Sequence, residues 1–91
     1  MVFSVFSPQR LLLHALLNGL GEAVRRNDGL TADRYYRRVR MMGRHFETNP
    51  ALSNALERLL LASDQWLAKP AERYAVGQQV LELIESVLAL L

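Results

Sequence analysis

Residues 31–47, TADRYYRRVRMMGRHFE, carry the pattern that decides the fold. Apolar side chains recur in this stretch at spacings of three and four, which places them on one side of a helix. The core side predicted in this way holds Ala32, Tyr35, Val39, Met42 and Phe46. A segment with one apolar side and one charged side is typical of a helix that packs against others in a bundle.

The charged side of this predicted helix is made of arginines. They are Arg37, Arg40 and Arg44 in a line, flanked toward one edge by Arg34 and Arg38. Like charges three or four residues apart cost roughly 0.2–0.5 kcal/mol per pair, and Asp33 and Glu47 offset only part of this repulsion. We therefore expect acidic groups to lie over this face, either from elsewhere in the chain or from a partner.

Three interpretations of the arginines stay open. A solvated helix surface needs no partner, because arginine favours helices and its stem covers apolar neighbours. An acidic protein surface or a nucleic acid would neutralise the same charges. Between the two kinds of partner we favour an acidic protein, because the apolar side of this helix belongs to the core and no short helix-turn-helix spacing is present.

Proline and glycine divide the chain into segments of helix length. The breaks are Ser7-Pro8, Asn27-Asp28-Gly29, Asn49-Pro50 and Lys69-Pro70. Between them we predict helices over residues 8–27, 32–48, 50–68 and 70–91. Gly29 would supply a left-handed residue after the first helix, and Thr31 would cap the second.

Connections of only a few residues favour antiparallel neighbours. We therefore expect an all-α, up-down-up-down four-helix bundle that forms one domain over residues 1–91. Residues 1–7 would precede the first helix as a short apolar arm, with Phe6 packed against that helix as a hydrophobic staple. Insertion of this arm, including Phe3, into another subunit is the alternative.

The first and third predicted helices each present one apolar stripe, and both stripes would contribute to the core. The first stripe contains Leu13, Leu16, Leu17, Leu20 and Val24, widened by Leu12 and Ala23. The stripe of the third helix contains Leu52, Leu56, Leu59, Leu60, Ser63, Trp66 and Leu67.

The last predicted helix has two apolar seams side by side. The first contains Gly77, Leu81, Ile84, Leu88 and Leu91, and the second contains Val76, Val80, Leu83, Val87 and Leu90. Because one apolar seam is enough to pack a helix into a bundle, the second seam should be covered by another surface. We predict that it forms a homodimer interface. The alternatives are coverage by other helices of the same chain or by a different protein.

Composition limits the classes of function. The chain is 51% hydrophobic and 22% charged, which excludes a disordered tail. Residues 1–45 carry a net charge of +5, and residues 46–91 carry a net charge of −3. Two such halves can neutralise each other in a bundle, so the overall charge of +2 is weak support for nucleic-acid binding.

Signatures of catalysis, cofactor binding and metal binding are absent from the sequence. There is no cysteine, and His14 and His45 have neither HxxxH nor HExxH spacing. We therefore expect no enzyme activity, no cofactor and no metal. A signal-peptide pattern and an apolar run long enough for a membrane span are also absent, so we expect a cytoplasmic protein without a membrane partner.

The stretch HALLNGL, which begins at His14, is similar to the phosphate-accepting helix of histidine kinases and phosphotransfer domains. In those helices leucine follows the histidine by two positions and asparagine by four, as Leu16 and Asn18 do here. Ala15 replaces the usual acidic neighbour, and Leu17 stands where phosphotransfer domains carry lysine. The resemblance implies a phosphate acceptor at His14, which is our third hypothesis for function.

These observations predict a small protein-binding helical bundle, such as an adaptor, chaperone, inhibitor or regulator. We expect a homodimer formed through the last helix and an acidic protein surface bound by the five arginines. A nucleic-acid-binding regulator that uses the same arginines is the alternative.

Overall fold

The computed structural model describes residues 7–91 and contains four α-helices, which confirms the predicted all-α bundle. They are α1 (Pro8–Arg25), α2 (Gly29–Met42), α3 (Pro50–Ala68) and α4 (Arg73–Leu90). Two short 3-10 helices, η1 (Gly43–Phe46) and η2 (Pro70–Glu72), follow α2 and precede α4. Residues 1–6, and with them the predicted packing of Phe3 and Phe6, lie outside the described part of the chain.

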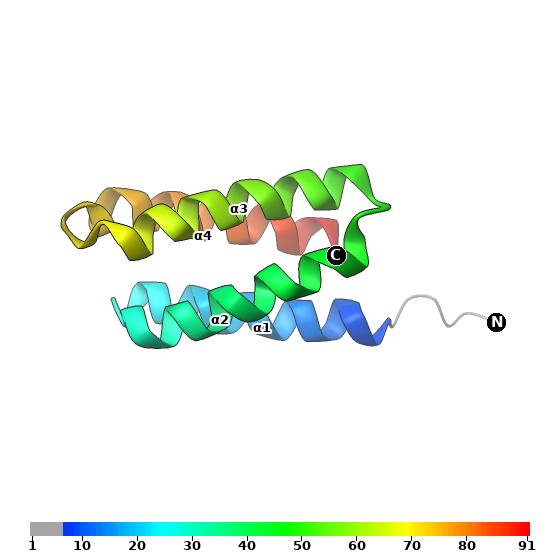
Figure 1. The fold of residues 1–91 in the computed structure, drawn as a ribbon, viewed down its shortest axis with the longest axis horizontal. Coiled ribbons are helices and arrows are strands. Elements are labelled where there is room, and N and C mark those ends of the chain that lie inside the picture. The colour runs from blue at the N-terminus through cyan, green and yellow to red at the C-terminus, as the bar shows by residue number, and fades with distance from the viewer. Residues whose placement is uncertain (1–6) are drawn as a thin grey trace.

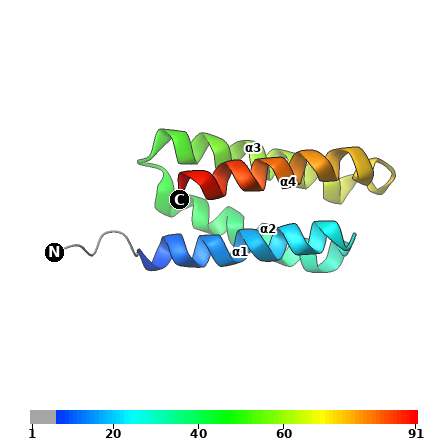
Figure 2. The ribbon, with the colours of Figure 1, turned by 180° about the vertical axis from the view of Figure 1, so that it is seen from behind.

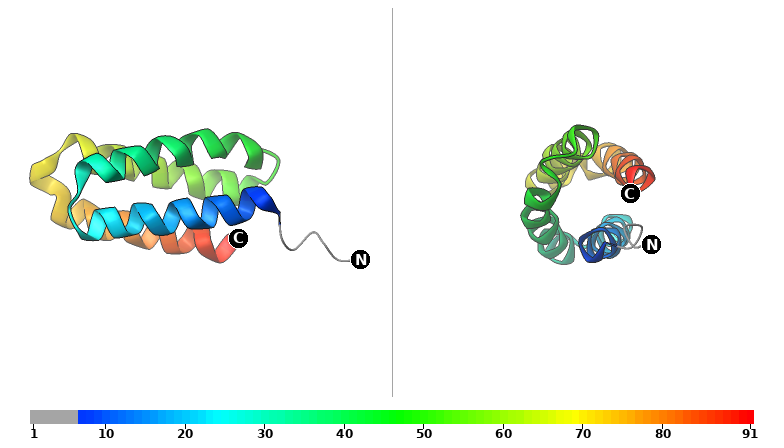
Figure 3. Two further views of the ribbon diagram at one scale, coloured as in Figure 1. Left: turned by 90° about the horizontal axis from the view of Figure 1, so that it is seen from below. Right: turned by 90° about the vertical axis from the view of Figure 1, so that its right-hand side faces the viewer.

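The helices form two hairpins that lie side by side. In Figure 1, α1 and α2 run in opposite directions along one side of the molecule, and α3 and α4 do the same along the other. The contact between the hairpins is larger for α1 with α4 than for α2 with α3. Figure 2 shows α1 and α4 from behind, and the end-on view in Figure 3 shows the helices following one another around the bundle axis.

The turn between α1 and α2 differs from the prediction. The left-handed residue is Asn27, with a φ of 54°, whereas Gly29 is the first residue of α2. Asparagine adopts this conformation more readily than most residues that carry a Cβ. The cap of α2 is Asp28 rather than Thr31, because the Asp28 carboxylate accepts from Thr31 N at 3.1 Å and from Thr31 Oγ1 at 2.7 Å.

These two bonds favour the ionised form of Asp28. The hydroxyl and the backbone N–H of Thr31, together with the charges of Arg26 and Arg34, lower the pKa of this carboxyl below its usual value. Because the folded-state pKa is the lower one, the cap stabilises the fold above the ordinary aspartate pKa of about 3.9. That contribution is lost as the pH falls through the folded-state pKa.

The remaining helix ends set the other boundaries. α1 and α3 begin at the predicted prolines, and α3 is capped by Asn49, whose Oδ1 accepts from Leu52 N at 3.2 Å. The α-helix predicted over residues 32–48 ends before residue 48. The chain changes to the 3-10 helix η1 at Gly43, because glycine has a low helix propensity. The last helix starts later than predicted, since the chain from Pro70 forms η2 before α4 begins.

The core contains most members of the predicted apolar stripes. Those that are buried come from all four helices, with Leu13, Val39, Leu59 and Val80 completely enclosed. Leu12 is the clear exception, because half of its surface is exposed at the edge of α1. Tyr35, Leu60 and Leu67 are half-buried. Ser63 is the one polar side chain in the core of the described chain, where its Oγ has no hydrogen-bond partner.

Gly19 allows α1 and α2 to approach each other closely. The ring of Tyr35 lies against the Gly19 backbone, and a Cβ at position 19 would overlap the ring carbons. Glycine is therefore the residue that leaves room for this packing. The contact holds the core side of α2 against α1, so that the opposite side of α2 faces outward.

Replacing Gly19 with alanine should destabilise the fold relative to Gly43→Ala. The added methyl group at position 19 overlaps the Tyr35 ring, whereas a Cβ at position 43 meets no atom of the described residues within 4 Å. Overpacking costs typically about 1–3 kcal/mol. We therefore expect the free energy of unfolding in urea to be at least ~1 kcal/mol lower for Gly19→Ala than for Gly43→Ala. Equal stability would mean that the Tyr35 ring does not hold α2 in place.

Candidate functional site

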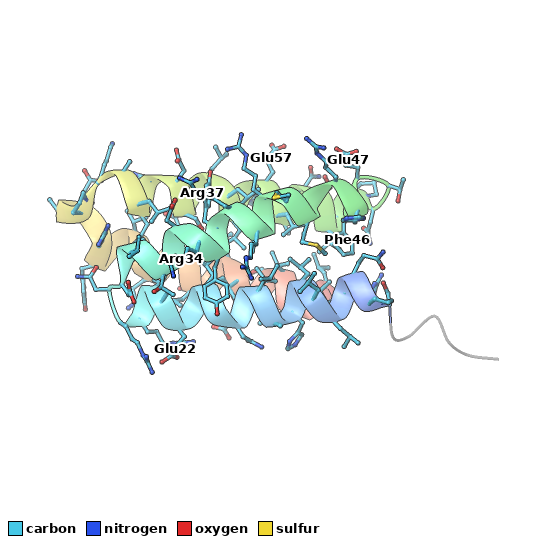
Figure 4. The ribbon with its side chains drawn as sticks, turned by 60° about the horizontal axis from the view of Figure 1, so that its bottom comes forward. Glu22, Arg34, Arg37, Phe46, Glu47 and Glu57 are labelled. Atoms are coloured by element: carbon cyan, nitrogen blue, oxygen red, sulfur yellow. The ribbon has the colours of Figure 1, made fainter. Side chains whose placement is uncertain are left out.

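The five predicted arginines lie together on the solvent side of α2 and η1. All five are exposed, while Val39 on the opposite side of the helix is enclosed in the core. By helical position, Arg34 and Arg38 follow one edge of this side, and Arg38 lines a groove with Leu12 and Leu16 of α1, while Arg37, Arg40 and Arg44 follow the other edge. Figure 4 shows Arg34 and Arg37 on these two edges.

One of these arginines has an ion-pair partner among residues 7–91. Nε of Arg37 lies 3.0 Å from Oδ2 of Asp33, one helical turn away. The other ion pairs of the described chain join Glu22 to Arg25 and Arg26 at the end of α1. In the part of the chain that the structure describes, no ion pair between side chains therefore joins the acidic second half to the basic first half.

Exposed apolar side chains form a centre within this charged surface. Met41 lies among the arginines and is 73% exposed. Beside it, a groove of about 280 Å³ runs between α1 and α2. The groove is lined by Leu12, Leu16, Arg38, Met41, Met42 and His45. We call the whole surface the α2 face and define it by Leu12, Met41, Arg34, Arg37, Arg38, Arg40 and Arg44.

Sequence reasoning missed the apolar centre of the α2 face. A signal was present, because Met41 follows Arg40 directly and lies three residues from both Arg38 and Arg44, on the side opposite the core. No pattern in the sequence indicated that Leu12 would be exposed. Its exposure depends on how α2 crosses α1, and the spacing of residues along a single helix does not determine that crossing.

Most residues predicted as a homodimer interface lie in the core of the single chain. Val76, Val80 and Val87 are buried, while Leu83 is half-buried and Leu90, at the end of α4, is 42% exposed. The buried side of α4 lies between the two predicted seams, because α4 packs against both α3 and α1. The interface prediction is therefore corrected: three of its five residues are not available to a second subunit in this fold. Self-association itself stays a prediction.

His14, which carries the resemblance to phosphotransfer domains, is exposed on α1. Its Nδ1 lies 3.1 Å from Nδ2 of Asn18. Among residues 7–91 no group of three histidine, cysteine or acidic side chains is placed to hold a metal ion. None of the helices described for these residues is both long and apolar enough to cross a membrane.

Val80→Ala tests whether this side of α4 belongs to the core or to a subunit interface. Val80 is completely buried within the chain, so the substitution should lower the free energy of unfolding by about 2 kcal/mol. The loss should be the same in dilute and in concentrated protein, because a core contact does not depend on concentration. Leu90→Ala, at an exposed position, is the control and should cost much less. A loss that changes with protein concentration would place Val80 between subunits.

Comparison with known proteins finds no match to this chain among family models, curated proteins or solved structures. The α2 face is accordingly interpreted from its own residues. Its distinguishing feature is an exposed apolar centre among five arginines, four of which have no ion pair within residues 7–91.

Proposed function

We propose that this chain is a small protein-binding bundle that uses the α2 face to bind a partner surface with both acidic and apolar side chains. The observation that carries the proposal is the exposed Met41 among the arginines. Methionine and arginine are both enriched in protein interfaces. A contiguous exposed surface of this kind on a small protein is typical of a binding face. Adaptors, chaperones, inhibitors and regulators all act through such faces.

The apolar centre would supply most of the affinity. Complete burial of Met41 and Leu12 is worth up to about 1.5–3 kcal/mol each, before the cost of association is subtracted. Charge pairs at the rim of an interface add less affinity, but they raise the association rate and fix the orientation of the partner. The partner therefore needs apolar side chains for the groove and carboxylates for the arginines around it.

Nucleic acid is the alternative occupant of the α2 face. The arginines could displace counterions from phosphates. Stacking with unpaired bases, however, needs exposed aromatic rings. Tyr35 packs against Gly19, and Tyr36 is half-buried. Met41 and Leu12 would gain nothing from phosphate contacts, so the surface favours a protein.

A second copy of the chain is one partner that fits this description. The outer side of α4 exposes Glu82 and Glu85 together with Leu90. These side chains offer the acidic and apolar groups that the α2 face requires. Self-association of this kind would use α2 of one copy and α4 of the other, rather than two copies of α4.

The proposal is tested with a labelled helical peptide of about 20 residues that carries leucine on one side and glutamate on the other. We expect fluorescence anisotropy to detect binding at about 0.1 M salt, where exposed charges are partly screened. Met41→Ser and the double variant Arg38→Gln/Arg40→Gln should each weaken binding about tenfold or more, because about 1.4 kcal/mol corresponds to a factor of ten.

The matched controls lie on α3. Leu61 is 67% exposed and Arg58 is also exposed, so Leu61→Ser replaces an exposed apolar side chain with serine and Arg58→Gln neutralises one arginine, both outside the α2 face. These variants should bind the peptide as the parent does. The proposal fails if the peptide does not bind or if Met41→Ser has no effect. Tight binding of a mixed-sequence DNA duplex, with a log–log salt slope near roughly −3 to −4, would support the nucleic-acid alternative instead.

A further inference from the structure

A second candidate site lies at the end of the bundle that holds the α1–α2 and α3–α4 connections. A cleft of about 380 Å³ opens there between the end of α1, the end of α3 and the start of α4. This volume is within the range of about 300–1,000 Å³ that is common for small-molecule sites. No residue of α2 lines the cleft, so it is separate from the α2 face.

Arg73 gives this cleft a positive charge that no carboxylate of residues 7–91 neutralises. Its Nε donates to the backbone oxygen of Trp66 at 3.1 Å, and its Nη1 donates to Oδ1 of Asn27 at 3.1 Å. The guanidinium also lies over the Trp66 ring, with Cζ 4.3 Å from the ring centroid. All of these partners are neutral. Arg25 is the second cation in the lining, and none of the residues that line the cleft in the described part of the chain is acidic.

The indole of Trp66 adds a hydrogen-bond donor. Trp66 is 2% exposed and forms part of the cleft wall, and none of the hydrogen bonds found within residues 7–91 has its Nε1–H as the donor. Gly77 lies directly beside this nitrogen, since a Cβ at position 77 would be 3.3 Å from it. The absence of a side chain at position 77 keeps the indole N–H accessible from the cleft.

We propose that this cleft binds a small carboxylic acid with an apolar body. The guanidinium groups of Arg25 and Arg73 and the indole N–H of Trp66 supply donors for a carboxylate. The side chains of Val24 and Leu81 supply an apolar wall for the rest of the ligand. A purely inorganic anion would leave this wall without a partner, which is why an apolar acid fits better than phosphate.

The chain contains one tryptophan, so the indole N–H gives a single NMR signal that reports on the cleft. We expect hexanoate to shift this signal in a saturable way in the millimolar range, and hexanamide, which has the same shape without the charge, to leave it unchanged. Arg25→Gln should weaken hexanoate binding about tenfold, because it removes a charge-assisted hydrogen bond. Gly77→Ala should reduce the shift by covering the indole nitrogen.

Arg26→Gln is the matched control. Arg26 neighbours Arg25 and also pairs with Glu22, but it does not line the cleft, so this variant should bind hexanoate like the parent. Arg73 is not substituted, because its hydrogen bonds join the α1–α2 connection to the α3–α4 connection. The proposal is overturned if hexanoate causes no shift, if hexanamide or inorganic phosphate binds as well as hexanoate, or if Arg25→Gln behaves like Arg26→Gln.

Discussion

The packing of α4 against both α1 and α3 holds the two hairpins together. Near the start of α4, Gly77 leaves room for Val24 of α1 and for the indole of Trp66, which lie 3.6 and 3.3 Å from the position a Cβ would take. Arg73 adds polar links, because it donates to Trp66 at the end of α3 and to Asn27 after α1. Since α4 packs against helices of both hairpins, most of its apolar surface is buried within the chain.

This arrangement leaves the outer side of α2 free. α2 packs mainly against α1 and only lightly against α3, so both edges of its outer side reach solvent. Repulsion among its arginines costs roughly 0.2–0.5 kcal/mol per pair, and the burial of Val39 and Met42 outweighs that cost. The helix can therefore keep a cluster of like charges around the exposed Met41. A partner with carboxylates would remove the repulsion and cover the methionine at the same time.

The sequence was sufficient for the features that depend on one helix at a time. Apolar spacing and proline positions predicted the number of helices, most of the core and the placement of all five arginines on one side. Features that depend on neighbours were not predictable in this way. The two seams of α4 belong to one core because α1 and α3 flank it, and the Arg73–Asn27 bond joins residues 46 positions apart. The prediction that Thr31 caps α2 was wrong, because aspartate and threonine are both common capping residues and Asp28, which accepts hydrogen bonds from Thr31, takes the cap position.

The central claim is that the apolar centre of the α2 face, and not its charge alone, makes it a binding site. The methyl NMR spectrum of methionine-labelled protein tests this directly, because the signal of the exposed Met41 reports on the centre of the α2 face and is identified by its loss in Met41→Ser. We predict that the leucine–glutamate peptide shifts and broadens the Met41 methyl signal, while a DNA duplex leaves it in place. An unchanged Met41 signal with saturating peptide would contradict the claim, and so would a Met41 shift caused by DNA.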